Sequence, residues 1–585
     1  MIRRIYCIIA LISLAASANA AITTASTNSA LAALSSSSSP VLRLGYHAQG
    51  DVPPQLYTAT SSACTANGGL GDGGSQVPTF DGKCWITSFP ADGVDVREFG
   101  AYCQSFDGAA GDADDTQAIQ YALAYAGTFA TPATVRLPGA GNKLCKVGGS
   151  PSTVSLLPLV VAQGVTFTGA GPKSVYSGLV VGSQNIALLV NVTGNQASVT
   201  SMMIDALGTQ SQSTTGVTIA INSATSTDDT IRDVYIKEPC FGLTISGSVH
   251  HVDNLNIAGV AGSGCVGIQI GGFTTNAASD DLEFRHVKVW SNPSNPAAVC
   301  MNILDAGGMF LEDSDMLWCS IGTQIKPGTN QWFTWGFFHN TALGDTGVQS
   351  GLLIDTGATS SEVLGLNCID CWFSSQSSGN GATLRNDGNG IVSGLDFNSA
   401  RALSNSGVGI DIESGVTGVT IENSQICASA GSAGVYLNTG AGEARIVNNT
   451  ITPSCNDRKA PSSSTGIDMV GSNADVTIIG NDLRGNTIEI NGFPSGNSFV
   501  SGNIDLVNNI PTIASASSIT LSTDWDTYVI TGTTTVSTIV GGWPGRVVTV
   551  ITTGGAISLT GCVAFTSTQN VPAIGKFNGT CWWWK

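Results

Sequence analysis

Acidic and aromatic side chains gather between residues 280 and 401, and they are the groups in this sequence best suited to chemistry. Asp315 and Asp370 fall in similar stretches, MFLEDSDMLW and VLGLNCIDCWF, and aligning these stretches places one aspartate over the other. If the stretches are strands two rungs apart in a stack, the carboxylates lie roughly 9–10 Å apart. That is near the upper limit for a pair in which one acid protonates a leaving oxygen and the other activates water. His339 falls between them and could adjust their protonation. We therefore predict Asp315, Asp370 and His339 as catalytic residues.

A second set of residues around these three is predicted to bind a sugar polymer. Flat aromatic faces suit sugar rings, because the apolar C–H faces stack while the hydroxyl groups stay hydrated. The simpler alternative is that such acids are merely solvated and that such tryptophans belong to the core. The predicted binding residues are Trp318, Trp332, Trp335, Trp372, Glu312, Asp313, Asp396 and Arg401.

A lyase is the alternative chemistry for the same region. It needs a base to remove a proton next to a carboxylate, often with Ca²⁺ held by acidic residues. The candidate bases are Arg285, Lys288 and Arg401, and the candidate Ca²⁺ ligands are Asp280, Asp281 and Glu283. We predict no cofactor and no metal site, unless a lyase uses Ca²⁺. Cys368 and Cys371 form a lone C-x-x-C, and in a strand their side chains would point to opposite faces.

Other functional classes lack a signature in this sequence. It has five histidines and no G-x-S-x-G, H-E-x-x-H or Walker-type motif. Its formal net charge is −18, which disfavours nucleic acid as a partner because phosphates require Lys and Arg. The same charge argues against a polyanionic ligand unless a cation bridges the two.

A repeat positions these residues. From about residue 155 to 505, short apolar–polar alternating segments such as VTSMMIDA alternate with a G-V-x-I type such as GVTIAI. The unit is roughly 25–30 residues, so about a dozen units fit, and stacking them buries one continuous apolar face. This predicts an all-β fold, a parallel β-helix, with Asn449 and Asn481 in a stacked amide ladder. A propeller is disfavoured because its blades need about 40 residues or more.

The segments outside the repeat are predicted as follows. Residues 1–20 resemble a cleavable signal peptide ending in Ala18-Asn19-Ala20 rather than a membrane anchor. Residues 21–40 are predicted to be a Ser/Ala-rich linker, 41–92 a small β-unit, 93–510 the β-helix, and 511–585 a separate β-module. Export agrees with four cysteine pairs about one repeat apart, which we expect to be disulfides: Cys64/Cys84, Cys240/Cys265, Cys427/Cys455 and Cys562/Cys581.

The segment from Val94, VDVREFGAYCQSFDGAAGDADDTQAIQYALAYA, resembles the opening sequence of the pectate-lyase-like superfamily, as in phage tailspikes and secreted depolymerases. The matching residues are Val96, Phe99, Gly100, Ala101, Gly111, Asp112, Asp114, Asp115, Thr116, Ala118, Ile119 and Gln120. From the residues alone, Asp114 or Asp115 should cap a helix that covers the first rung. An insertion at residues 102–110 and the signal peptide depart from the tailspike pattern.

The resemblance implies a right-handed parallel β-helix with an N-terminal capping helix and a small C-terminal β-domain. Together with the signal peptide and the spacing of Asp315 and Asp370, it leads us to predict an exported protein that binds and cleaves a surface or extracellular polysaccharide, with an inverting glycoside hydrolase favoured over a lyase. A non-catalytic adhesin or tail-fibre-like protein is the alternative. The signal peptide favours secretion over a place in a virion. The resemblance further implies a homotrimer, with Trp582, Trp583 and Trp584 as the expected contact between subunits.

Overall fold

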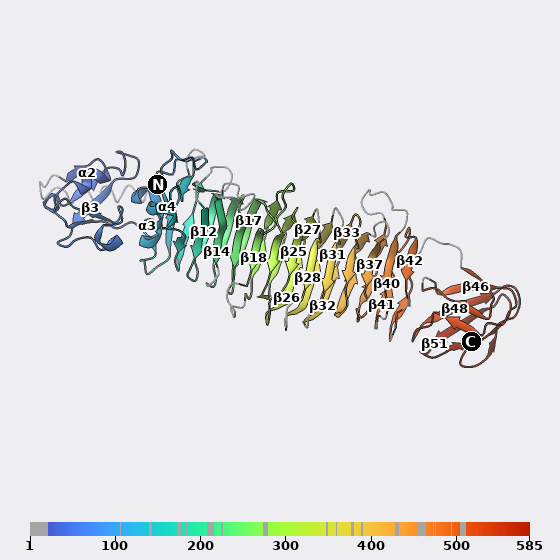
Figure 1. The fold of residues 1–585 in the computed structure, drawn as a ribbon. Helices are drawn as coiled ribbons and strands as arrows, with labels where there is room; N and C mark the ends of the chain where they lie inside the picture. The colour runs from blue at the N-terminus through green and yellow to red at the C-terminus, as the bar shows by residue number, and fades with distance from the viewer. Residues whose placement is uncertain are drawn as a thin grey trace, which may run out of the picture.

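The protein is elongated, with a small unit at each end of a long coil of strands (Figure 1). The computed structural model describes residues 22–585 except for residues 106, 140–142, 172–176, 183–184, 207–215, 224–225, 273–278, 347–348, 358–359, 376–378, 388–389, 428–431, 454–463, 472, 474, 493, 496, 504–510 and 524. The predicted signal peptide therefore lies outside the described residues. No described helix is long and apolar enough to cross a membrane.

The N-terminal unit begins earlier than the sequence suggested. Its five-stranded sheet has the order β1-β2-β3-β5-β4, and the strands are β1 Thr23–Ala25, β2 Val41–Arg43, β3 Gln55–Ala59, β4 Gln76–Pro78 and β5 Cys84–Ile86. The prediction of a linker over residues 21–40 is wrong, because β1 pairs with β2 and helix α2 (Asn28–Ala32) packs into the same core. The serine-rich stretch is held by side-chain contacts, since Ser36 donates to Asp81 and Trp85 Nε1 donates to the Leu31 carbonyl.

A helix covers the first rung, as the sequence predicted. Helix α3 (Thr116–Ala126) buries Ile119, Ala122 and Leu123 in the core shared with the β-helix. The side chain of Asp114, rather than that of Asp115, caps the helix, because Asp114 Oδ1 accepts the Thr116 N–H at 3.0 Å. Asp115 instead accepts the backbone N–H groups of Tyr102 and Cys103, and burial raises its pKa to about 6. These aspartates are structural.

The G-V-x-I segments form one parallel sheet of 13 strands, stacked along the axis (Figure 1). Each strand pairs with its equivalents in the rungs before and after it. The strands are β9 Leu159–Val161, β12 Asn185–Val192, β14 Gly216–Ser223, β16 Phe241–Ile245, β18 Val266–Ile270, β21 Val299–Ile303, β25 Ile321–Ile325, β28 Leu352–Asp355, β31 Ala382–Arg385, β34 Ile410–Ile412, β37 Ala433–Leu437, β40 Thr465–Met469 and β42 Ile488–Asn491.

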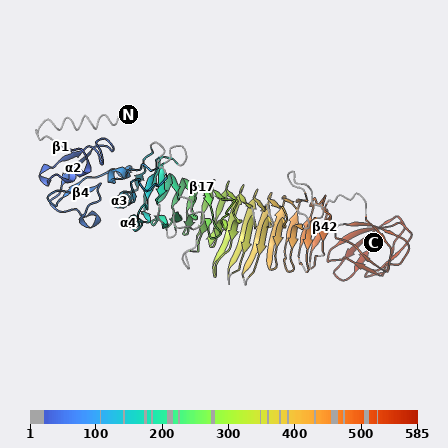
Figure 2. The same ribbon diagram turned by 45° about the horizontal axis from the view of Figure 1, so that its top comes forward.

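The other strands belong to a 25-stranded array, in which most rungs contribute two segments. Figure 2 shows the same coil from a second direction. The strands are β6 Val94–Asp95, β7 Ala133–Arg136, β8 Cys145–Val147, β10 Val165–Thr168, β11 Gly178–Val181, β13 Ser198–Asp205, β15 Thr230–Lys237, β17 His251–Val260, β19 Glu283–Arg285, β20 Lys288–Ser291, β22 Ala306–Gly307, β23 Phe310–Glu312, β24 Asp315–Leu317, β26 Trp332–His339, β27 Ala342–Thr346, β29 Glu362–Ile369, β30 Trp372–Ser375, β32 Ile391–Asn398, β33 Arg401–Ser404, β35 Val416–Glu422, β36 Gln425–Cys427, β38 Arg445–Val447, β39 Thr450–Thr452, β41 Thr477–Ile479 and β43 Phe499–Ser501.

A single residue with positive φ bends each rung between its two segments. The strand registers stack these residues along the axis, and we call them the bend column. Asn and Asp tolerate this left-handed conformation better than other non-glycine residues, because their short polar side chains bond locally. The column comprises Ser201, Asp233, Asn254, His286, Asp313, Asn340, Asp370, Ser399, Asn423 and Asn448.

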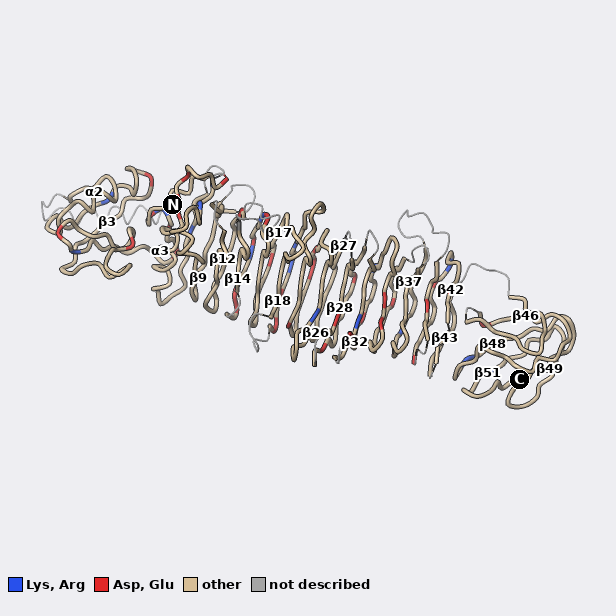
Figure 3. The backbone as a smooth tube through the Cα atoms, viewed as in Figure 1, with Lys and Arg blue, Asp and Glu red and all other residues tan. Residues whose placement is uncertain are grey.

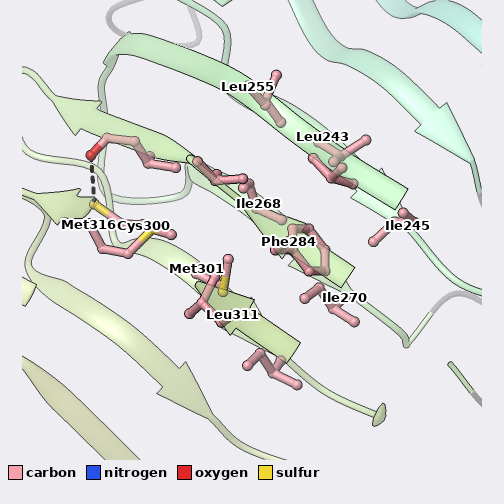
Figure 4. Close-up of a cluster of buried hydrophobic side chains, with 14 of the residues drawn as sticks. Leu243, Ile245, Leu255, Ile268, Ile270, Phe284, Cys300, Met301, Leu311 and Met316 are labelled. Carbon is pink, nitrogen blue, oxygen red and sulfur yellow. Dashed lines mark hydrogen bonds between the residues drawn. The ribbon is translucent and has the colours of Figure 1, made fainter. Parts of the chain in front are cut away.

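Two kinds of stack fill the interior. Aliphatic side chains from successive rungs lie over one another, as Leu243, Ile268 and Met301 do (Figure 4). The predicted amide ladder is confirmed: Asn449 Nδ2 donates to Asn481 Oδ1 at 3.0 Å, and Asn481 Nδ2 donates to Asn503 Oδ1 at 2.9 Å. These asparagines follow the bend and point inward. The parallel β-helix predicted from the repeat is therefore confirmed.

Disulfides join cysteines in all parts of the molecule. Three of the four expected bridges are present: Cys64–Cys84, Cys240–Cys265 and Cys562–Cys581. Cys427 is also disulfide-bonded, and its expected partner Cys455 lies outside the described residues. Cys103–Cys145, Cys300–Cys319 and Cys368–Cys371 were not predicted. The prediction that Cys368 and Cys371 face opposite ways is wrong, because the chain bends between them at Asp370.

The C-terminal module has a five-stranded sheet with its own core. Its order is β44-β46-β48-β51-β52, and the strands are β44 Thr512–Ala514, β46 Thr527–Thr531, β48 Val547–Thr552, β51 Pro572–Phe577 and β52 Trp582–Trp584. Buried Trp543 packs into the core cluster of the β-helix and so covers its last rungs. Successive residues of β52 alternate faces, so Trp582 is buried, Trp584 is half-buried, and Trp583 is 52% exposed. Only Trp583 of the three fits an outer contact surface.

Candidate functional site

The strand register places the predicted catalytic aspartates differently from the sequence alignment. Asp315 pairs with Ala342, which pairs with Trp372, so Asp315 and Trp372 are in line along the axis. Asp370 belongs to the bend column, in line with Asn340 and Asp313. The predicted placement of Asp315 over Asp370 is therefore wrong by two residues. The bend recurs at the same position in successive rungs, but Asp370 lies at the bend of its rung whereas Asp315 lies two residues after the bend of its own.

Asp315 and Asp370 nevertheless line one pocket. Its volume is about 440 Å³, and it opens on the outer surface where the bend column meets β24, β27, β30 and β33. Four predicted site residues, Asp315, Asp370, Trp372 and Arg401, lie in its wall. Sequence reasoning missed the other lining residues, which come from the bend column and from the positions directly after it. They are Asn340, Thr341, Ala342, Cys371 and Ser399.

The two carboxylates have different surroundings. The Lys288 ammonium lies 3.0 Å from Asp315 Oδ2 and stabilises its negative charge. Asp370 is approached by His339, whose Nε2 lies 4.0 Å from Asp370 Oδ2, although His339 does not line the pocket. Arg401 lies over the face of Trp372, with Cζ 5.7 Å from the ring centre. The pocket thus holds one carboxylate in an ion pair, one beside an imidazole, and a cation stacked on an aromatic wall.

A second pocket continues the first along the bend column. Its volume is about 650 Å³, and its lining residues include Asp233, Asp253, Asn256, His286 and Lys288. The Lys288–Asp315 pair joins the two pockets, because Lys288 lines one and Asp315 lines the other. We call the two pockets together the bend groove. It covers seven bend positions, from Asp233 to Ser399, or about 29 Å at about 4.8 Å per rung.

The remaining predicted tryptophans lie outside the lining of the groove. Trp318 contacts Trp290, with ring centres 6.2 Å apart, and Trp290 does line the second pocket. Trp332 and Trp335 are on β26 and are exposed. Beyond Trp335 on the same strand, Phe337 stacks on Phe310 with ring centres 5.1 Å apart, and both are exposed. Sequence analysis missed these two phenylalanines because it considered only tryptophan as a sugar platform.

Trp335 has an unusual backbone. Its φ is +55°, in line with Gly308 and Gly365 of the adjacent rungs, which also have positive φ. A non-glycine residue there costs roughly 1–2 kcal/mol. The indole is 69% exposed and therefore recovers little by packing. A strained, exposed tryptophan between two glycines points to a role outside folding.

The acidic residues predicted to surround Asp315 and Asp370 either bond to other side chains or lie away from the groove. Glu312 pairs with Arg285 at 3.2 Å, and Asp313 accepts from Asn340 Nδ2 at 2.6 Å. Asp396 lies on β32, away from the groove lining. Burial raises the pKa of Asp396, and the negative charge of Glu422 adds to the effect.

The Ca²⁺ ligands considered for a lyase do not assemble into a cluster. Burial, followed by the charge of Asp281, raises the pKa of Asp280. Within the described part of the chain, the group of side chains close enough to hold one metal ion is Cys103, Asp115 and Cys145. Cys103 and Cys145 form a disulfide, so this group lacks the thiolates that a metal would need.

Several solved structures resemble this chain at low sequence identity. No protein-family model matches the chain, and neither does any curated protein. The A-module of mannuronan C-5 epimerase AlgE6 from Azotobacter vinelandii has a TM-score of 0.39 at 16% identity, covering 71% of this chain and 100% of that one. The capsular polysaccharide depolymerase gp49, a tailspike of Acinetobacter baumannii bacteriophage Fri1, has a TM-score of 0.41 at 11% identity, covering 73% and 72%. PfbA, a surface adhesin of Streptococcus pneumoniae, has a TM-score of 0.43 at 13% identity, covering 71% and 93%.

Proposed function

We propose that the protein binds a polysaccharide in the bend groove and hydrolyses it between Asp315 and Asp370. One observation carries this proposal: two carboxylates from different rungs line a single outer pocket together with an aromatic wall and a cation. Hydrolysis of a glycosidic bond needs two such acids. Trp372 supplies a flat face on which a sugar ring can stack.

The surroundings of the two acids suggest their roles. We assign the general base to Asp315, whose Oδ2 lies 3.0 Å from the Lys288 ammonium. It takes a proton from a water molecule whose oxygen attacks the anomeric carbon. We assign the general acid to Asp370, which gives its proton to the leaving glycosidic oxygen as the C–O bond breaks. His339 Nε2 lies 4.0 Å from Asp370 Oδ2 and positions that carboxyl group.

The spacing disfavours retention. The two rung steps between Asp315 and the rung of Asp370 amount to about 9–10 Å along the axis, and the two-residue offset between the aspartates adds to this separation. A retaining enzyme needs carboxyl groups only about 5–5.5 Å apart, whereas an inverting one needs about 6.5–9.5 Å to admit water. Trp318, Trp332 and Trp335 extend the contact surface beyond the groove.

Export and assembly are part of the same proposal. Disulfides from the N-terminal unit to the C-terminal module fit an oxidising compartment outside the cytoplasm. We also expect a homotrimer, with the exposed Trp583 at a contact between subunits. Light scattering of the full chain checks this, and a monomer would contradict it.

The test is the release of reducing ends from a panel of bacterial and plant polysaccharides. Asp315→Asn and Asp370→Asn should each reduce release by a factor of about 100 or more, because each removes one proton-transfer step. Asp468→Asn is the matched control, because Asp468 lies on β40 of the 13-stranded sheet, outside the groove lining. Full activity in both groove variants would refute the assignment.

Two other outcomes identify the alternatives. Products that absorb in the ultraviolet as unsaturated sugars would show elimination, with Lys288 or Arg401 as the base. Tight binding without any cleavage would indicate a glycan-binding adhesin.

A further inference from the structure

We infer that the bend groove selects an uncharged, hydroxyl-rich polysaccharide and disfavours a polymer of uronic acids. This inference rests on the proposed function of the groove and specifies its class of substrate. It depends on two features of the groove wall: its charge balance, and the contacts in which its cations are already engaged.

The charge balance of the groove is negative. Its lining carries four carboxylates, Asp233, Asp253, Asp315 and Asp370, against two cations, Lys288 and Arg401. The groove therefore has a formal charge of −2 with its imidazole neutral. Figure 3 shows the Lys and Arg positions as short separate segments of the tube, interspersed with Asp and Glu positions. A polyuronate carries repeated carboxylates and would meet like charge.

The cations of the groove are already engaged. Lys288 is 3.0 Å from Asp315, and Arg232, beside the groove, is 3.6 Å from Asp233. Arg401 lies over the face of Trp372, and no carboxylate of the described residues is within ion-pair distance of it. One cation is too few to bind a chain that bears repeated carboxylates.

The amide donors are also engaged within the groove. Asn254 Nδ2 donates to Asp233 at 2.8 Å, and Asn340 Nδ2 donates to Asp313 at 2.6 Å. His286 shares a hydrogen bond of 2.9 Å with Asp253. Each of the two amides thus uses one N–H on a neighbouring aspartate of the bend column.

The negative charge balance and the engaged cations of the groove therefore favour a neutral glycan over a polyuronate.

Pairs of an acidic polysaccharide and its carboxyl-reduced form test this, because they share linkages and differ in charge. Binding is measured for several such pairs at low and at high NaCl, each with Ca²⁺ or with EDTA. We expect every pair that binds to prefer the reduced form by about tenfold at low salt. We also expect salt to strengthen binding of the acidic form, because it screens repulsion.

Asp253→Asn supplies the matched variant, because it removes one groove charge outside the proposed catalytic pair. It should reduce the preference for the reduced form over the acidic form about threefold, because one fewer groove charge repels the acidic form. Preference for the acidic form, with or without Ca²⁺, would overturn the inference and leave the polysaccharide site intact. Failure to bind any member of any pair would count against the proposed function as well.

Discussion

Trp335 offers a test in which two variants should differ in stability but lose the same amount of binding affinity. The perturbation is a pair of variants, Trp335→Gly and Trp335→Ala. At an ordinary strand position Gly is less stable than Ala by about 0.5–1 kcal/mol, because it loses more backbone freedom on folding. Trp335 has φ +55°, where Ala pays the left-handed penalty of about 1–2 kcal/mol and Gly does not. We therefore expect Trp335→Gly to be more stable than Trp335→Ala by about 1 kcal/mol.

Native-state hydrogen exchange of the β26 amides is the assay, because a difference of this size is hard to resolve in the unfolding of so long a chain. About 1 kcal/mol corresponds to about fivefold in protection. Phe337 is the matched control, since it is exposed on the same strand without a positive φ. There the order should be reversed, with Phe337→Ala above Phe337→Gly. Equal or lower protection in Trp335→Gly than in Trp335→Ala would refute the argument from strain.

The binding side of the test uses the same variants. If the strain is retained because the exposed indole stacks on a sugar, both Trp335 variants should lose affinity for the polysaccharide equally, by about fivefold. Unchanged affinity in both would show that Trp335 is strained for a reason other than glycan contact.

Three further predictions follow from the geometry. Asn481→Ala should lower the free energy of unfolding by about 3 kcal/mol or more, because the Asn481 side chain is fully buried and makes four hydrogen bonds within the ladder. Thr450→Ala, at an exposed position beside the ladder, is the control. In the same denaturant series it should cost less than about 0.5 kcal/mol. Burial, followed by the negative charge of Glu413, raises the pKa of Asp411 to about 6, so the folded state binds a proton more tightly than the unfolded state does. The free energy of unfolding should therefore fall by about 1–2 kcal/mol as pH rises from about 4 to 6. Asp411→Asn should flatten this pH dependence in thermal melts, and an unchanged pH dependence would contradict its assignment to Asp411. Trp372→Ala should weaken binding of an uncleaved glycan to the Asp370→Asn variant, measured by calorimetry, and equal affinity would exclude Trp372 from the site.

The fold was predictable because its signal repeats. Alternation of apolar and polar residues, renewed every rung, predicts stacked strands, and Asn449 and Asn481 predict the ladder that the structure contains. The N-terminal unit was harder, because a Ser/Ala-rich stretch resembles a linker by composition. Only long-range contacts, such as Trp85 with the Leu31 carbonyl, reveal that it is folded.

The sequence predicted which residues lie near one another in the site, but not how the strands that carry them are aligned. A strand alignment shifted by two residues keeps every side chain on its face, so the alternating pattern cannot detect the error. The bend column sets the register, because Asp313, Asn340 and Asp370 occupy its positive-φ positions. The bend can be recognised in the sequence as a polar residue directly before an inward-facing position. The bend at Asp370 also turns Cys368 and Cys371 toward one another.

Hydrogen–deuterium exchange of the full chain with and without a bound polysaccharide tests the central claim most directly, namely that the bend groove is the binding site. We expect the ligand to protect peptides containing β20, β24, β27 and β30 and the bend residues beside them, including Asp313, Asn340 and Asp370. Peptides of the 13-stranded sheet should exchange unchanged. Protection confined to that sheet or to the C-terminal module, with the groove peptides unaffected, would contradict the account.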